Sequence, residues 1–233
     1  MNKKSLIFNQ IKHPNDVSDL YHIYNQPNIL NVLYWIEYFE MVRNVEGSIV
    51  ECGVGRGRSL ITILALQQYY KNVSERHVFA LDSFEGFPEP SIEDESPRNP
   101  KKGEWSSSPN NQFDYSVNNL KKILNKADIS NLEYTLIKGF FDKSTKELDV
   151  EEIAILHLDG DLYDSIKQPL INLSNKIVLN GIIVIDDYVL NDENKNNEAF
   201  PGARLAVEEF LFENDNFKIK ESIRGTPFMI RTR

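Results

Sequence analysis

Short apolar runs alternate along this chain with longer segments whose apolar residues recur at helical spacing. Strands are expected at residues 48–51, 77–81, 134–137, 153–158 and 182–185, with two weaker ones around 217–220 and 227–231. Helices are expected at residues 28–43, 59–70, 113–124, 141–148, 163–177 and 202–212. This alternation predicts an α/β protein whose mostly parallel sheet is covered on both faces. The last two strands are expected to form an antiparallel hairpin at one edge.

The length and composition predict a single domain over residues 1–233. The chain is 41% hydrophobic, which suits an ordinary globular protein with a sizeable core. Residues 1–45 are expected to form an N-terminal helical arm, and the apolar helix at 29–42 within it suggests a homo-oligomer. The segment 88–112 is rich in Pro, Ser, Asn and charge and has no periodicity. Such a segment is either an active-site lid or a disordered loop.

Charge and targeting signals exclude some classes of partner. The formal net charge is −9, which argues against nucleic acid. The N-terminus lacks the apolar stretch of a signal peptide, and no segment approaches the roughly 20 apolar residues of a membrane helix. We therefore expect a cytoplasmic protein without a membrane span. Cys52 is the one cysteine, so no intramolecular disulfide can form.

A glycine-rich turn follows the first expected strand. The stretch Glu51-Cys52-Gly53-Val54-Gly55-Arg56-Gly57 joins that strand to a helix, as in nucleotide-binding sheets. Gly53 and Gly55 would let the backbone approach a ligand closely. The acid at Glu51 would repel a pyrophosphate and favour a cationic ligand such as S-adenosylmethionine. Asp82 ends the next strand, where an acid often binds a ribose.

Acidic residues gather where the expected strands end. They are Glu51, Asp82, Asp159, Asp161, Asp186 and Asp187. A single such acid usually forms a turn or caps a helix, but Asp186 and Asp187 together raise each other's pKa unless a cation intervenes. Asp159, Asp186 and Asp187 therefore form a candidate site for Mg²⁺, Ca²⁺ or Mn²⁺. His157 is either a base or a hydrogen-bonded residue of the core.

Four stretches in order resemble the macrocin-type (TylF/MycF) O-methyltransferases. They are residues 51–57, 81–88, 158–165 and 185–188. The resemblance implies the class I methyltransferase (Rossmann-like) fold, with seven strands of which the last is antiparallel. It also implies Mg²⁺ on Asp159, Asp186 and Asp187, with Asp159 acting in addition as the general base. The cofactor contacts that it implies are Glu51, Gly53, Arg56, Asp82, Ser83, Phe84, Gly139 and Phe140.

The expected function is therefore metal-dependent O-methylation of a hydroxyl on a sugar or sugar-containing small molecule, with S-adenosylmethionine as cofactor. The alternatives are an NAD(P)-dependent sugar-modifying enzyme, a catechol-type O-methyltransferase and a binding protein without chemistry. Arg58 stands where the family often has a small residue. The N-terminal arm and the segment 88–112 match the family poorly, so the identity of the glycosyl acceptor stays open.

Overall fold

A computed structural model describes residues 26–233 except 74, 108–113, 128, 130–132, 189–198 and 224. Its strands are β1 (Ser48–Cys52), β2 (Val78–Asp82), β3 (Tyr134–Lys138), β4 (Ile153–Leu158), β5 (Ile177–Ile185), β6 (Phe217–Glu221) and β7 (Pro227–Arg231). Its α-helices are α2 (Gln26–Met41), α3 (Arg58–Tyr70), α4 (Val117–Lys126), α5 (Phe141–Ser144), α6 (Tyr163–Leu173) and α7 (Pro201–Glu213). Two short 3₁₀ helices are η1 (Ile92–Asp94) and η2 (Ser174–Lys176).

The strands form one seven-stranded sheet in the order β3-β2-β1-β4-β5-β7-β6. The five strands from β3 to β5 are parallel, and β7 runs antiparallel to both β5 and β6. All six residues of β4 are buried, as a central parallel strand covered on both faces requires. This confirms the mostly parallel sheet and the antiparallel hairpin at its C-terminal edge.

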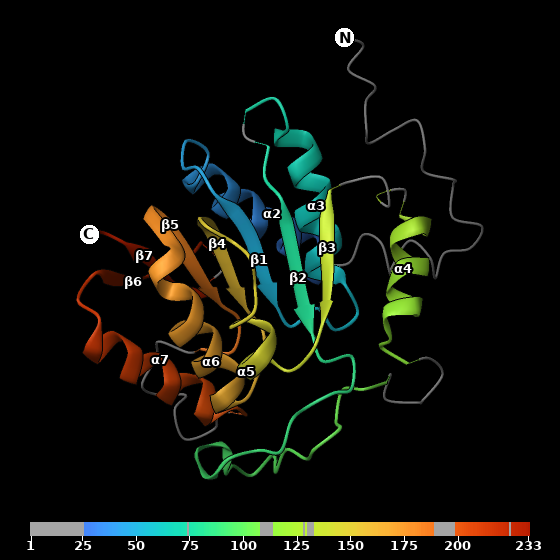
Figure 1. The fold of residues 1–233 in the computed structure, drawn as a ribbon, viewed down its shortest axis with the longest axis vertical. Coiled ribbons are helices and arrows are strands. Elements are labelled where there is room, and N and C mark those ends of the chain that lie inside the picture. The colour runs from blue at the N-terminus through green and yellow to red at the C-terminus, as the bar shows by residue number, and fades with distance from the viewer. Residues whose placement is uncertain are drawn as a thin grey trace.

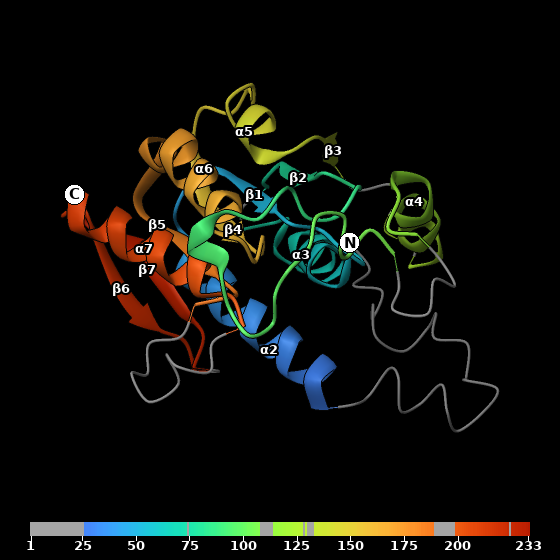
Figure 2. The ribbon, with the colours of Figure 1, turned by 90° about the horizontal axis from the view of Figure 1, so that it is seen from below.

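Helices cover both faces of the sheet (Figures 1 and 2). The helices α2, α3 and α4 share one hydrophobic cluster with the sheet, and α6 and α7 share the other. Side chains alternate between the two clusters along a strand: Ile49 belongs to the first and Val50 to the second. The five parallel strands all end at the lower side of Figure 1, so the loops that follow them meet there.

Helix α2 covers the sheet through a row of aromatic side chains. Tyr34, Trp35 and Tyr38 are almost fully buried, and their rings meet edge to face at centroid distances of 4.6–5.9 Å. The first turns of the same helix expose apolar side chains, among them Ile29 and Leu33. Among the helices described here, none combines the length and apolar character needed to cross a bilayer.

The structure corrects three expected boundaries. Helix α4 begins at Val117, not at residue 113, because the Ser116 side chain accepts a hydrogen bond from the Asn119 amide and caps it. Helix α5 ends at Ser144, well before residue 148. Strand β5 begins at Ile177, the residue at which a helix was expected to end, because α6 stops at Leu173 and η2 turns the chain into the sheet.

The segment 88–107 crosses the carboxyl ends of the strands and reaches the starts of α6 and α7 (Figure 2). Asp94, which is 2% exposed, attaches this segment to the start of α6. The Asp94 carboxylate accepts hydrogen bonds from the Tyr163 amide at 2.7 Å and from the Ser91 amide at 2.9 Å. Gly202 packs against this carboxylate, since a Cβ there would lie 2.1 Å from Asp94 Oδ1. The expected lid, as far as residue 107, is thus anchored at its middle; residues 108–112 lie outside the described residues.

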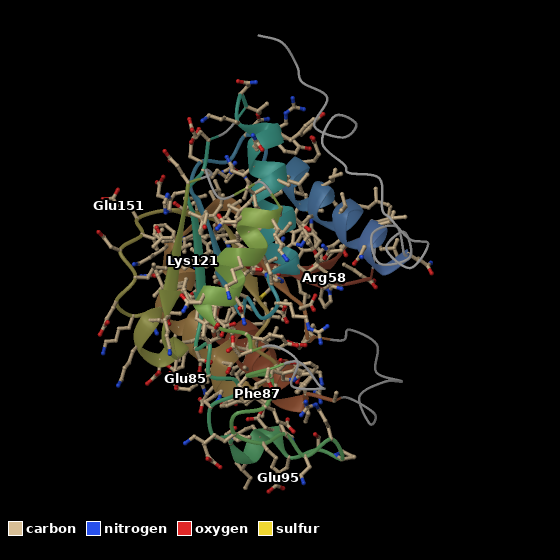
Figure 3. The ribbon with its side chains drawn as sticks, turned by 90° about the vertical axis from the view of Figure 1, so that its right-hand side faces the viewer. Arg58, Glu85, Phe87, Glu95, Lys121 and Glu151 are labelled. Atoms are coloured by element: carbon tan, nitrogen blue, oxygen red, sulfur yellow. The ribbon has the colours of Figure 1, made fainter. Side chains whose placement is uncertain are left out.

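We expect Asp94→Ala to destabilise the protein, because it leaves the buried Tyr163 amide without its acceptor. The free energy of unfolding should fall by about 2 kcal/mol, measured by urea denaturation. Glu95→Ala is the matched control, since the exposed Glu95 lies at the outer end of the segment (Figure 3). The control should change stability by less than about 0.5 kcal/mol. Equal effects of the two substitutions would contradict the anchoring role of Asp94.

Candidate active site

A cavity of about 930 Å³ opens at the carboxyl ends of the parallel strands. In open α/β sheets ligands bind in the crevice outside these strand ends, where the strand order reverses, here between β1 and β4. Its walls come from α2, the glycine turn after β1, the segments after β2 and β3, and the ends of β4 and β5. Residues far apart in sequence, such as Trp35, Asp82 and Asp187, therefore face one space.

The glycine turn is held by Asp82. Its Oδ2 accepts hydrogen bonds from the Val54 amide at 2.9 Å and the Gly55 amide at 3.0 Å, and its Oδ1 accepts one from the Phe84 amide at 2.6 Å. The amides of the turn, which would meet a pyrophosphate in a dinucleotide site, thus already bond to a carboxylate. Asp82 also lines the cavity, in agreement with its expected place beside a ligand.

Gly53 brings the turn against the end of β4. Its φ is +101°, and a Cβ there would lie 1.8 Å from the Asp159 carbonyl oxygen. The adjoining Cys52 carbonyl accepts a hydrogen bond from the Asp159 amide at 2.9 Å. Glycine is required here both for its backbone conformation and for this close approach.

Glu51, which was expected to orient the cofactor directly or through water, is not among the residues that line the cavity. Its side chain is fully buried, and its Oε1 lies 3.3 Å from Nδ1 of His157, which is also buried. The Glu51 carboxylate therefore does not face a ligand in the cavity and would not repel a phosphate there directly. The carboxylate that meets the glycine turn is Asp82.

Three carboxylates converge at the ends of β4 and β5. One ligand oxygen each from Asp159, Asp186 and Asp187 can be chosen so that all lie within 4.8 Å of one another. Asp159 directly follows β4, and the other two directly follow β5, its parallel neighbour. All three are half-buried and line the cavity. The sequence had indicated this cluster, and the structure brings it together.

Burial and mutual repulsion act strongly on these acids. Burial, followed by the charges of Asp186 and Asp187, raises the pKa of Asp159 well above its ordinary value. Burial and the charges of Asp161 and Asp186 do the same to the pKa of Asp187. Two or more carboxylates in one site behave in this way when no cation is present to compensate them.

Asp161 joins the cluster, although the sequence analysis did not include it in the metal site. Its backbone has a φ of +62°, and its amide donates to Asp187 Oδ2 at 3.0 Å. Burial and the charge of Asp159 raise the pKa of Asp161 to about 7. The signal in the sequence was the Asp159-Gly160-Asp161 spacing, which places a second acid beside the end of β4.

The remaining expected cofactor residues lie around the same turn. Arg56 lines the cavity and donates from Nε to the Tyr115 hydroxyl at 2.7 Å. Ser83 also lines it, while its hydroxyl donates to the Gly86 carbonyl at 2.8 Å. Phe84 packs against the hydrophobic core at a φ of +52°. The exposed ring of Phe140 lines the cavity, directly after Gly139 with its φ of +159°.

Three residues of the cavity wall were not among the site residues expected from the sequence. Arg58, the first residue of α3, lines the cavity and is labelled in Figure 3. Trp105, from the segment 88–107, also lines it, as does Tyr115 from the segment before α4. Only the tertiary fold brings these three segments to one opening.

Solved structures share this architecture. The calicheamicin methyltransferase CalS11 superimposes with a TM-score of 0.74 at 22% identity, covering 97% of this chain and 88% of that one. The O-methyltransferase NovP superimposes with a TM-score of 0.67 at 24% identity, covering 89% and 80%. The fold is therefore that of the class I methyltransferases, as the resemblance had implied.

Sequence comparison gives relatives of known name. The chain is 29% identical over 172 residues to demethyldecarbamoylnovobiocin O-methyltransferase of Streptomyces niveus, covering 74% of this chain and 61% of the relative. It is 25% identical over 169 residues to mycinamicin III 3''-O-methyltransferase of Micromonospora griseorubida, covering 71% and 61%. The chain thus spans about three-fifths of the length of these curated relatives.

The sequence pattern of the family described as Macrocin-O-methyltransferase (TylF) matches residues 36–218, which is most of the chain. The chain therefore belongs to the macrocin-O-methyltransferase (TylF) family.

Proposed function

We propose that this protein is an S-adenosylmethionine-dependent and divalent-cation-dependent O-methyltransferase that acts on a hydroxyl of a sugar or sugar-containing small molecule. The observation that carries the proposal is the convergence of Asp159, Asp186 and Asp187 in one cavity with the glycine turn. Family membership supports the reaction class. The carboxylate cluster adds the chemistry that an unactivated hydroxyl requires.

The donor set suits a hard divalent cation such as Mg²⁺. All the donors are carboxylate oxygens, which Mg²⁺, Ca²⁺ and Mn²⁺ prefer over the nitrogen and sulfur ligands typical of Zn²⁺. Burial and the charge of Asp186 raise the pKa values of both Asp159 and Asp187, so a cation at the cluster would relieve this repulsion. We assign the ion to Asp159, Asp186 and Asp187. When bound, Mg²⁺ would act as a Lewis acid that makes a coordinated sugar hydroxyl easier to deprotonate.

Asp159 is the proposed general base. It is the member of the cluster that directly follows β4, and its backbone contacts the glycine turn, the proposed cofactor site. Its carboxylate would accept the hydroxyl proton as the oxygen attacks the methyl carbon of S-adenosylmethionine. The bond between that carbon and sulfur would break, and S-adenosylhomocysteine would leave with the electron pair. The reacting atoms must be about 3 Å apart and in line, which makes the fixed backbone of Asp159 part of the catalysis.

The cofactor is assigned to the turn after β1 and the ends of β2 and β3. Gly53 would allow close approach of the ligand, and Asp82 would hold the turn and face the ribose. Phe140 offers an exposed ring at the mouth for an adenine. The further cofactor residues in this proposal are Arg56, Ser83, Phe84 and Gly139, with Glu51 in an indirect part.

A dehydrogenase is less well supported. A proton relay for hydride transfer would need a tyrosine and a lysine four residues apart facing the substrate. Tyr163 and Lys167 have that spacing, but both contact Glu209 on α7, at 2.7 and 3.0 Å. Tyr134 and Lys138 share the spacing, and Lys138 pairs with Glu85 at 2.9 Å. These four residues do not line the cavity described above.

The names of the relatives support a glycosyl acceptor. One relative, from Streptomyces olivaceus, is named as a 4'-O-methyltransferase of a tetracenomycin that bears a dimethoxy-rhamnosyl group. Another is named for the 3'' position of mycinamicin III. We therefore propose a sugar hydroxyl next to a second hydroxyl or ether oxygen, so that two oxygens can reach the acid cluster. The homo-oligomer suggested by the sequence stays a prediction.

The proposal is tested by incubating the full chain with S-adenosylmethionine, Mg²⁺ and a panel of glycosides, nucleotide sugars and catechols. S-adenosylhomocysteine should form with at least one sugar and not with the catechols. Calorimetry should detect binding of S-adenosylhomocysteine and no binding of NAD. Product formation with catechols alone would favour the catechol-type enzyme, and NAD binding in place of the nucleoside cofactor would reject the methyltransferase.

A further inference from the structure

The end of β1 contacts the catalytic strand β4 at three successive residues. Glu51 lies opposite His157 in the parallel register, and Glu51 Oε1 lies 3.3 Å from His157 Nδ1. The Cys52 carbonyl accepts the Asp159 amide at 2.9 Å. Gly53 then lies so close to the Asp159 carbonyl that any side chain would collide with it. The stretch known from sequence as a cofactor motif is therefore also the immediate support of Asp159.

In the Glu51–His157 pair, His157 lines the cavity and Glu51 is not among the lining residues. Glu51 is 0% exposed and His157 is 2% exposed, so water cannot solvate the carboxylate. A buried carboxylate is costly unless a hydrogen-bond donor or a positive charge compensates it. The His157 Nδ1, 3.3 Å from Glu51 Oε1, is within hydrogen-bond distance and can serve as that donor. This pair is built into the sheet and is not a surface contact.

The imidazole ring is held on a second side as well. The Trp35 ring from α2 meets the His157 ring edge to face, at 4.9 Å between centroids and 81° between planes. His157 and Asp159 lie two residues apart along one strand direction, and both line the cavity. The Glu51 carboxylate and the Trp35 indole thus hold the His157 ring from two sides, two residues before Asp159.

We propose that Glu51 is a positioning residue for Asp159, acting through His157 and the adjoining main chain, and that it does not touch the cofactor. The inference rests on the proposed function, since it gives Glu51 a part in holding the acid cluster that would bind the cation. The two strand-end acids then have separate tasks. Asp82 holds the glycine turn for the cofactor, and Glu51 holds β4 for the base.

The experiment compares Glu51→Leu, Glu51→Gln and Asp82→Asn with the wild-type chain. Mn²⁺ affinity is measured by electron paramagnetic resonance titration and S-adenosylhomocysteine affinity by calorimetry, with no turnover needed. Glu51→Leu should weaken Mn²⁺ binding roughly tenfold to a hundredfold, the range typical for residues that orient metal ligands, and leave S-adenosylhomocysteine binding within about twofold. Glu51→Gln keeps an acceptor oxygen for His157 and should recover most of the Mn²⁺ affinity.

Asp82→Asn is the reciprocal control. It replaces one of the oxygens that accept the amides of Val54, Gly55 and Phe84, so it should weaken S-adenosylhomocysteine and leave Mn²⁺ unchanged. If Glu51→Leu does not fold, His157→Asn serves instead, because its side-chain amide can still donate to Glu51 while the ring is lost. His157→Asn should weaken Mn²⁺ without affecting S-adenosylhomocysteine.

Each outcome bears on one claim. Weakened S-adenosylhomocysteine with unchanged Mn²⁺ in Glu51→Leu or His157→Asn would overturn the inference and place Glu51 with the cofactor. Unchanged affinity for both ligands would overturn it as well. A wild-type chain that takes up no Mn²⁺ would instead reject the metal requirement of the proposed function, a result distinct from any behaviour of the variants.

Discussion

Asp159→Asn should reduce methyl transfer by about 10³-fold or more while S-adenosylhomocysteine still binds. General base catalysis alone contributes roughly 10²–10⁴-fold. The asparagine cannot accept the proton and is a poorer ligand for a hard cation, so both proposed roles are lost together. The amide of residue 159 donates a hydrogen bond to the Cys52 carbonyl, and the substitution leaves this bond in place. The glycine turn should therefore keep its shape.

The measurement is single-turnover transfer from S-adenosylmethionine to an accepted sugar, with calorimetric S-adenosylhomocysteine binding in parallel. Asp164→Asn is the matched control, because Asp164 also lines the cavity but lies outside the acid cluster. The control should retain turnover within about threefold, because Asp164 is exposed to solvent and does not belong to the carboxylate cluster. If Asp159→Asn turns over at a rate close to that of the wild type, Asp159 is not the general base.

Removal of the cation is the second large effect. A chelator should abolish turnover of the wild-type chain, and added Mg²⁺ or Mn²⁺ should restore it. Asp186→Asn should weaken Mn²⁺ binding at least about tenfold, because one of three anionic ligands is lost.

The same substitution should increase the stability of the metal-free protein. The Asp186 charge raises the pKa of both Asp159 and Asp187, so its removal relieves repulsion in the metal-free protein.

We therefore expect metal-free Asp186→Asn to be more stable than metal-free wild type by about 1 kcal/mol, measured by urea unfolding in chelator. Saturating Mn²⁺ should reverse the order, because only the wild-type site gains the full binding energy. If Asp186→Asn is less stable than wild type in chelator, the Asp186 carboxylate stabilises the metal-free fold through another contact and does not destabilise it by repulsion. Full turnover in the presence of chelator would exclude the metal role altogether.

The sequence alone predicted most elements of the sheet because the local pattern carries that information. Burial on both faces makes β4 continuously apolar, and an apolar run ending in two acids marks the end of β5. The sequence was less informative where a cap decides the boundary. Ser116 and not the apolar spacing sets the start of α4.

The candidate site divides in the same way. The chain by itself determined that Asp159, Asp186 and Asp187 would meet, because parallel neighbouring strands end at the same edge of the sheet. Only the tertiary structure decided what each other acid contacts. Glu51 faces His157 across a strand pair, and Asp94 reaches the first amide of α6 from a distant segment. Partners of this kind depend on long-range register and loop packing, and no local pattern in the sequence records them.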